Sequence, residues 1–124
     1  MPDRPLPQPT QSAPALPGAH PLFDPATFIP TLELALHGLT EPREIRAATV
    51  AHIAPARAQA MADVLAGFAA HPRAARETVR AIAAVTDAVV AAVHHVAVTC
   101  LHPQHSQTTS ERLAVMAVGG YGRA

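Results

Sequence analysis

The sequence contains no lysine and no tryptophan, and it has a single cysteine among its 124 residues. Because Cys100 has no second cysteine to pair with, the chain forms no internal disulfide, which fits a reducing compartment. The N-terminus also lacks the apolar stretch of a secretory signal peptide, so we expect a cytoplasmic protein. Aromatic residues make up only 3% of the chain, and alanine supplies much of its apolar content. We therefore expect a thin core that is completed by further chain, because alanine buries little area.

The chain has no net charge with its histidines neutral, because nine basic residues balance nine acidic residues. A neutral chain has no electrostatic attraction for nucleic acid or an anionic membrane, so neither is expected as a partner. The run from Ala81 to Leu101 is nevertheless long enough to cross a bilayer. Asp87, near the middle of this run, would cost roughly 2.5–3.5 kcal/mol on insertion. That cost favours a soluble helix over a membrane span.

Proline is concentrated at the N-terminus, where nine of the thirteen prolines lie in the first thirty residues. Proline fixes φ and donates no backbone hydrogen bond, so this composition predicts a disordered, proline-rich tail over residues 1–21. The motif RPLPQP leaves a ligand for an SH3-type domain open as an alternative. Ordered structure is expected from about Phe28.

Helical patterns follow the tail and predict a helical region over residues 22–110. A short helix is expected at residues 31–38, where Gly38 would end it. Thr40 then has the character of an N-cap for a second helix, which Pro55 should break or kink at Ala54. One face of this second helix is expected to carry Ile45, Thr49, Ile53, Ala60, Met61, Val64, Leu65 and Phe68.

The strongest helical pattern runs from about Arg73 to Leu101. One face of this helix is expected to be polar, with Arg80, Asp87 and His94. Another face is expected to carry a steady apolar stripe, formed by Ile82, Val85, Val89, Val93, Val96 and Cys100. A polar loop follows, and then the apolar run RLAVMAV, which is too short for a helix and is typical of a strand buried on both faces. Because one strand cannot form a sheet by itself, we expect an incomplete fold.

Three glycines after this run, Gly119, Gly120 and Gly122, are the strongest candidates for a binding site. Consecutive glycines let the backbone bend tightly and present N–H groups to an anion, and Arg123 could reach a phosphate oxygen. A tight turn with no ligand explains the same spacing equally well. A dinucleotide-binding motif is a further alternative, but its third glycine would lie beyond Ala124.

Histidines and the cysteine near the end of the long helix raise the possibility of a metal site, from His94, His95, Cys100, His102 and His105. Adjacent histidines diverge on a helix, and no pair has the helical four-residue spacing of a two-ligand site. We therefore expect these histidines to be structural or solvated, and we expect no metal site. Cys100 lies on the apolar stripe and is expected in the core.

The end of the chain, ERLAVMAVGGYGRA, resembles the strand and glycine turn that begin the nucleotidyltransferase domain of the bacterial PII uridylyltransferases. The preceding AVTDAVVAAVHHVAV resembles the helix that leads into this strand in the same enzymes, which are also called bifunctional uridylyltransferase/uridylyl-removing enzymes. The resemblance is good over residues 70–124 and loose before them. Its implied fold is mainly α in this fragment, with helices leading into the first strand and glycine turn of a truncated α/β nucleotidyltransferase domain of the polymerase-beta-like superfamily, at residues 111–124.

The resemblance implies that Gly119 and Gly120 cradle the phosphates of UTP and that Tyr121, Gly122 and Arg123 complete the motif. It also implies an acidic pair that holds Mg²⁺, which this sequence does not contain, so we expect neither catalytic nor metal-binding residues here. The full-length enzyme would transfer UMP from UTP to a tyrosine of the nitrogen regulator PII and remove it again, with glutamine as effector. We expect the fragment alone to be inactive and to bind neither UTP nor Mg²⁺ stably. The alternative is a small helical structural or interaction module with a disordered glycine tail.

Overall fold

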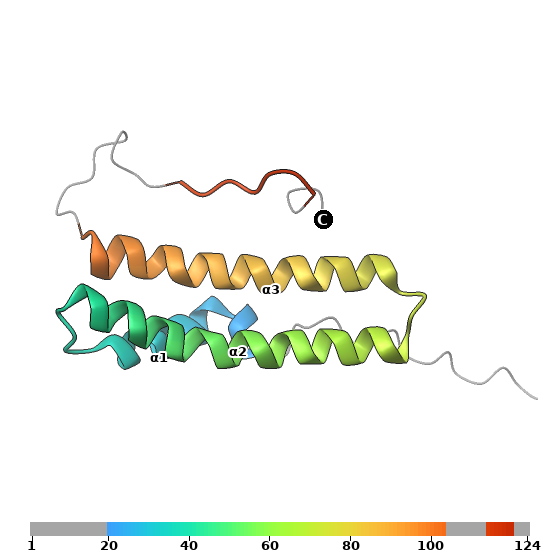
Figure 1. Ribbon diagram of the computed structural model, residues 1–124, viewed down its shortest axis with the longest axis horizontal. Helices are drawn as coiled ribbons and strands as arrows, with labels where there is room; N and C mark the ends of the chain where they lie inside the picture. Colours follow the sequence, from blue (N-terminus) through green and yellow to red (C-terminus); the bar gives the residue numbers. More distant parts are fainter. Residues whose placement is uncertain (1–19, 104–113, 121–124) are drawn as a thin grey trace, which may run out of the picture.

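The computed structural model describes residues 20–103 and 114–120, and these residues are mainly helical (Figure 1). Three helices account for most of them: α1 (Pro25–Leu36), α2 (Pro42–Ala70) and α3 (Ala75–Val96). A 3-10 turn, η1 (Pro21–Phe23), precedes α1, and a π-helical turn, η2 (Ala97–Leu101), extends α3. The expected proline-rich tail lies outside the described residues up to residue 19.

The two long helices α2 and α3 form an antiparallel hairpin, and α1 lies against the half of it that contains the start of α2 (Figure 1). The connections are short, five residues between α1 and α2 and four between α2 and α3. Residues 114–118 run in extended form along the side of α3 that faces away from α2 (Figure 1). The expected mainly helical character is therefore confirmed for the described residues.

Helical structure begins earlier than the proline content predicted, at Pro21 and not near Phe28. The first residues of η1 and α1 are both prolines, Pro21 and Pro25, which suit these positions because a first-turn amide has no intrahelical acceptor. Asp24 caps α1, and its carboxylate accepts a hydrogen bond of 3.1 Å from a backbone amide of the first turn. The proline content therefore predicted the start of ordered structure too late in the chain, because proline is favourable at the first position of a helix.

The predicted break at Pro55 is wrong, since α2 continues through it from Pro42 to Ala70. Pro55 cannot donate to the carbonyl of Ala51, but both residues are exposed, so water can reach that carbonyl. Ile53 and Ala60 are buried on either side of the proline. Packing on a common core therefore holds the two halves of α2 in one helix despite the lost hydrogen bond.

Glycine does end α1 as predicted, although the helix starts six residues before Thr31. Gly38 has a φ of +79°, a left-handed conformation that favours glycine just beyond a helix C-terminus. The second expected cap is displaced by one residue, because Glu41 and not Thr40 is the N-cap of α2, and it makes no side-chain capping bond.

The core lies between the three helices and is built from small and medium side chains, as the composition predicted. Its largest fully buried side chains are Leu22, Leu32 and Val85. The other buried apolar residues are Phe28, Leu36, Ile45, Ile53, Ala60, Val64, Ala81, Ala92 and Val96. Three alanines in this set confirm that the core is thin.

The predicted apolar stripe of α3 is correct at Val85 and Val96 and wrong at two other positions. Ile82 is 37% exposed and Val93 is 49% exposed, whereas the alanines Ala81 and Ala92 are buried. On α2, Leu65 and Phe68 of the predicted apolar face are likewise exposed, whereas Ala60 and Val64 are buried. The buried face of α3 thus includes two alanines beside Val85 and Val96, and periodicity of the large apolar residues alone does not identify these alanines.

The segment Ala75–Leu101 is long and apolar enough to cross a membrane by length and composition, but only 22% of its most apolar window is buried. In the described structure it packs against α2 along one face, and Asp87 in its middle is exposed. Two of its large apolar residues, Val79 and Val93, are therefore about half exposed in the described structure.

The exposure of neighbouring leucines in α1 generates a matched test of the core. Leu32 is fully buried and Leu34 is 77% exposed. Leu32→Ala should lower the free energy of unfolding by about 2–5 kcal/mol, because it removes buried methyl groups and leaves a cavity. Leu34→Ala should change it by less than about 0.5 kcal/mol. Urea unfolding followed by circular dichroism measures both, and equal losses would contradict the packing of α1.

Candidate functional site

The glycine turn follows the extended segment directly, as the sequence predicted. Residues 114–118 are extended and Gly119 and Gly120 form a turn. Gly119 has a φ of +69°, so the left-handed conformation falls here and not at Gly120. A Cβ added at either glycine would meet no atom within 4 Å. Conformation therefore requires glycine at Gly119, whereas at Gly120 the described protein leaves open space beside the backbone. Tyr121, Gly122 and Arg123 lie outside the described residues.

The extended segment before the turn is not a buried strand within the described residues. Val115, Met116 and Val118 are 59%, 81% and 70% exposed. A strand buried on both faces needs neighbouring strands and two covering layers, and among residues 20–103 it is α3 that lies beside this segment. A cavity of about 560 Å³ separates the two, and it is lined from the helix by Asp87, Val90, Ala91 and His94.

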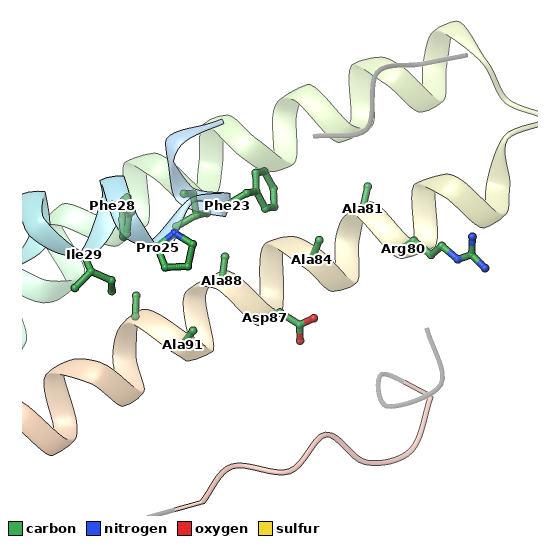
Figure 2. Close-up of a pocket in the computed structure, with 12 residues that line it drawn as sticks. Phe23, Pro25, Phe28, Ile29, Arg80, Ala81, Ala84, Asp87, Ala88 and Ala91 are labelled. Carbon is green, nitrogen blue, oxygen red and sulfur yellow. The ribbon is translucent and has the colours of Figure 1, made fainter. Parts of the chain in front are cut away.

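A second cavity, also of about 560 Å³, lies between α3 and the elements η1 and α1 (Figure 2). We call it the alanine groove, because one wall is made of α3 alanines, namely Ala81, Ala84, Ala88, Ala91 and Ala92. The other wall is made of Leu22, Phe23, Pro25, Phe28 and Ile29. Only Arg80 and Asp87 bring charge to its lining, and Figure 2 shows the Asp87 carboxylate turned away from the aromatic wall.

The alanine groove offers mainly apolar contact. Sequence reasoning missed it, although one signal was present. Alanines recur at positions 81, 84, 88 and 91 with helical spacing, so small side chains line one side of α3. Part of the other wall, namely Leu22, Phe23 and Pro25, precedes Phe28, near which ordered structure was expected to begin.

Two histidines link helices across the core edge. His95 Nε2 lies 2.8 Å from Glu33 Oε1 and so joins α3 to α1, with side chains 29% and 55% exposed. His52 Nε2 lies 3.1 Å from Thr31 Oγ1, which joins α2 to α1. A partly exposed pair of this kind contributes at most about 1 kcal/mol. The prediction of a structural role is therefore confirmed for His95.

No group of three His, Cys, Asp or Glu side chains that could hold a metal ion occurs in residues 20–103 and 114–120. His102 is exposed, and His105 lies outside these residues. Cys100 is partly buried and packs against the core, as predicted. Its sulfur lies 3.4 Å from Thr99 Oγ1, a contact that supplies no base for nucleophilic chemistry.

Comparison with curated proteins gives three bacterial relatives, each named bifunctional uridylyltransferase/uridylyl-removing enzyme. The protein of Cereibacter sphaeroides is 44% identical over 92 residues, which are 74% of this chain and 10% of that protein. The protein of Ruegeria pomeroyi is 39% identical over 103 residues, which are 82% of this chain and 11% of that protein. The protein of Phenylobacterium zucineum is 47% identical over 47 residues, or 38% of this chain and 5% of that protein.

The chain is homologous to a segment of the bifunctional uridylyltransferase/uridylyl-removing enzymes. The resemblance predicted from the sequence is thus confirmed. The Ruegeria match leaves less than a fifth of the chain unmatched. This unmatched part is too short to reach α1 from the N-terminus, which precedes Pro25, or to reach α3 from the C-terminus, which follows Val96. Wherever that match lies, it includes all three helices, so the helical region itself belongs to the shared sequence.

The chain spans about a tenth of the length of the first two relatives. No protein-family model matches the chain. None of the solved structures matches it.

The scattered positions of the histidines predict that zinc does not stabilise the chain. One equivalent of Zn²⁺ should leave the melting temperature unchanged relative to a sample with EDTA, because a structural zinc site requires four ligands in one place. Thermal unfolding by circular dichroism measures this. A zinc-dependent rise that disappears in a His102→Ala variant would show instead that residues outside the described ranges complete a site.

Proposed function

We propose that this chain forms the front of the nucleotidyltransferase domain of a PII uridylyltransferase. In this proposal, its helices lead into the first strand of an α/β domain, and the glycine turn binds the phosphates of UTP. The full-length enzyme would transfer UMP from UTP to a tyrosine of the nitrogen regulator PII and remove it under glutamine control in the cytoplasm. The observation that carries the proposal is the turn at Gly119, which follows an extended apolar run in a chain homologous to uridylyltransferases.

Backbone geometry supports a role for the turn in holding phosphate. A residue with positive φ next to residues with ordinary dihedrals can direct successive N–H groups to the same side and so form an anion-binding concavity. Gly119 has the required φ, and the open space at Gly120 would let a phosphate approach the backbone closely. In the proposed site, Tyr121, Gly122 and Arg123 complete the binding segment, and the Arg123 guanidinium contacts a phosphate oxygen.

The resemblance also implies Mg²⁺ held by paired carboxylates, and this part of the chain does not fit that role. Residues 112–124 contain no Asp or Glu, and the described residues contain no group of three metal-ligating side chains. We therefore assign to this chain the binding of substrate phosphate alone. The metal and the catalytic carboxylates would come from other parts of the full-length enzyme.

A helical structural or interaction module remains the competing function, and the apolar surfaces favour it. The alanine groove and the exposed side of α3 are large apolar features in a chain of this size. The two functions differ in their dependence on glycine, because an interaction module does not use the turn.

The isolated chain should not transfer UMP, because the carboxylates that position the metal are absent from it. Purified residues 1–124 are incubated with PII, Mg²⁺ and UTP labelled at the α-phosphate, beside the full-length Cereibacter sphaeroides enzyme as a positive control. Label on PII in the reaction with the isolated chain would overturn the proposal that this piece depends on the rest of an enzyme.

Gly120→Val tests the phosphate-binding turn in a chimera in which this chain replaces the homologous segment of the Cereibacter enzyme. The branched side chain would occupy the space that the phosphate needs, so UTP binding and UMP transfer should both fall, by roughly tenfold or more. The initial rate of UMP transfer at several UTP concentrations measures both effects. Removal of UMP from modified PII, which we assign to a separate domain, should be retained and is the internal control.

Equal loss of both activities would indicate a folding defect and not a binding defect. Transfer at the parental level with Gly120→Val would show that the turn does not bind phosphate, and the interaction module would then be the better description of this chain.

A further inference from the structure

The α2–α3 hairpin has one side next to α1 and an opposite side on which large apolar residues are exposed. Two contacts mark the side next to α1, because His52 of α2 meets Thr31 and His95 of α3 meets Glu33. Successive residues of an α-helix turn by about 100° around its axis, so the residues opposite each histidine follow from their spacing. Residues opposite the histidines on the two helices therefore share one surface of the hairpin, away from α1.

Six exposed apolar residues lie about 140–160° around their helices from these histidines, and we call the surface that they form the bare face. Its members are Val50, Leu65 and Phe68 of α2 and Val79, Ile82 and Val93 of α3. Leu34 of α1 is the one other large apolar residue that the described helices leave exposed, so the exposure is concentrated on one surface. Scattered apolar residues need no explanation, but a patch of this kind indicates an interaction surface.

The charges on this side of the hairpin are all positive and all belong to α2, from Arg43, Arg46 and Arg57. On α3, the polar residue on this side is Thr86, whose hydroxyl donates a hydrogen bond of 3.1 Å to the Ile82 carbonyl and is therefore already satisfied. The acidic residues of the two helices lie within about 80° of the histidines, on other sides: Glu44, Asp63, Glu77 and Asp87. The α3 half of the bare face can thus be covered without burying a charge.

We propose that the bare face joins two copies of this chain, so that two α2–α3 hairpins pack into a four-helix bundle. The size of the face suits this occupant. The 22 residues of α3 are about 33 Å long, and two helices about 10 Å apart offer roughly 650 Å² to a partner. Specific interfaces bury about 600–1,000 Å² on each side. The chain has no net charge, so two copies also have no long-range repulsion.

The arginines of α2 determine how the two hairpins pair. Arg57 lies between Val50 and Leu65, near the middle of the bare face, so packing α2 on the partner's α2 would bring two Arg57 side chains together. Packing α2 on the partner's α3 instead places Arg57 over the uncharged side of that helix. Every helix then runs antiparallel to its neighbours, as in a four-helix bundle.

This arrangement brings Leu65 of one copy near the partner's Val79. Leu65 lies five residues before the end of α2, and Val79 lies four residues after the start of α3, so the two are at similar heights in the hairpin. In the bundle, α2 of one copy follows the position of its own α2 along the partner's α3. The apolar residues of the two copies are therefore in contact with one another.

An anionic membrane is the competing occupant, because apolar residues bordered by arginine are also typical of interfacial helices. Such helices are rich in basic residues on their polar face, whereas the polar sides of α2 and α3 carry the four acidic residues named above. These acidic residues would repel anionic lipid, and the neutral chain as a whole gains no attraction to it. A second copy therefore suits the face better.

A matched pair of substitutions tests the pairing in the 124-residue chain. Leu65→Asp places a charge on the bare face, where Leu65 is 54% exposed, and Leu34→Asp places the same charge on α1, where Leu34 is 77% exposed. Both side chains are more than half exposed in the single chain, so both variants should keep the helical circular dichroism of the parent. Sedimentation equilibrium over a range of protein concentrations gives the mass of each.

The parent chain and Leu34→Asp should both reach twice the monomer mass of 12.9 kDa, with similar dissociation constants. Leu65→Asp should raise the dissociation constant by at least about tenfold, because an unpaired charge is costly to bury in an interface. Val79→Asp, on the other helix, should have the same effect and takes the place of Leu65→Asp if that variant loses its helical signal.

Disulfide formation tests the arrangement of the two copies. In a Cys100→Ser background, chains with Leu65→Cys are mixed with chains of a different length that carry Val79→Cys, and the mixture is oxidised. A disulfide between the two kinds of chain should form faster than a disulfide between two Leu65→Cys chains, because the thiols of different helices lie closer together.

A monomer at every concentration would overturn the proposal, and so would equal dissociation constants for Leu65→Asp and Leu34→Asp or a mass that keeps rising beyond two copies. A monomeric chain that binds phosphatidylethanolamine–phosphatidylglycerol vesicles, and loses this binding in Leu65→Asp, would assign the face to a membrane. Dimers in which two Leu65→Cys chains cross-link as fast as the mixed pair would reject the packing of α2 on the partner's α3.

Discussion

The packing of α2 against α3 organises the described helices, and buried alanines are part of the core that they share with α1. Ala60 on α2 and Ala92 on α3 are almost completely buried, so a large side chain at either position would have to displace its neighbours. The helix α1 and the turn η1 then pack against the hairpin, with Leu22 and Leu32 closing the core. Since alanine buries little apolar area, each of the few large core residues contributes a large share of the hydrophobic stabilisation.

A core with few large side chains explains which helical features could be predicted from the sequence. The end of α1 at Gly38 and the long helix ending near Leu101 follow from local chemistry, and both are present. The break at Pro55 also follows from local chemistry, but tertiary packing on both sides of the proline outweighs it. Buried positions were the least predictable feature, because periodicity identifies a stripe by its large residues, whereas three of the buried positions, Ala60, Ala81 and Ala92, are alanines.

The glycine turn could be predicted from the sequence, whereas the alanine groove could not. Glycines after an apolar run are a local signal, and a turn with positive φ at Gly119 is what such a signal predicts. The groove depends on Phe23 and Phe28 meeting α3 from a distant part of the chain, and no local pattern encodes that meeting. The strand expected at RLAVMAV has an extended backbone where it is described, at residues 114–118, but lacks strand partners among the described residues, because strand pairing is a property of a sheet and not of one segment.

The short connections between the helices have a consequence for the order of folding. Each long helix packs against its neighbour in sequence, so the chain makes its main contacts without closing long loops. Helical domains of this kind fold in microseconds to milliseconds, faster than a ribosome adds a residue. The α2–α3 hairpin can therefore be complete while a ribosome is still adding the residues that follow it. The apolar residues that α3 leaves exposed in the described structure, Val79, Ile82 and Val93, are then in contact with water during that interval.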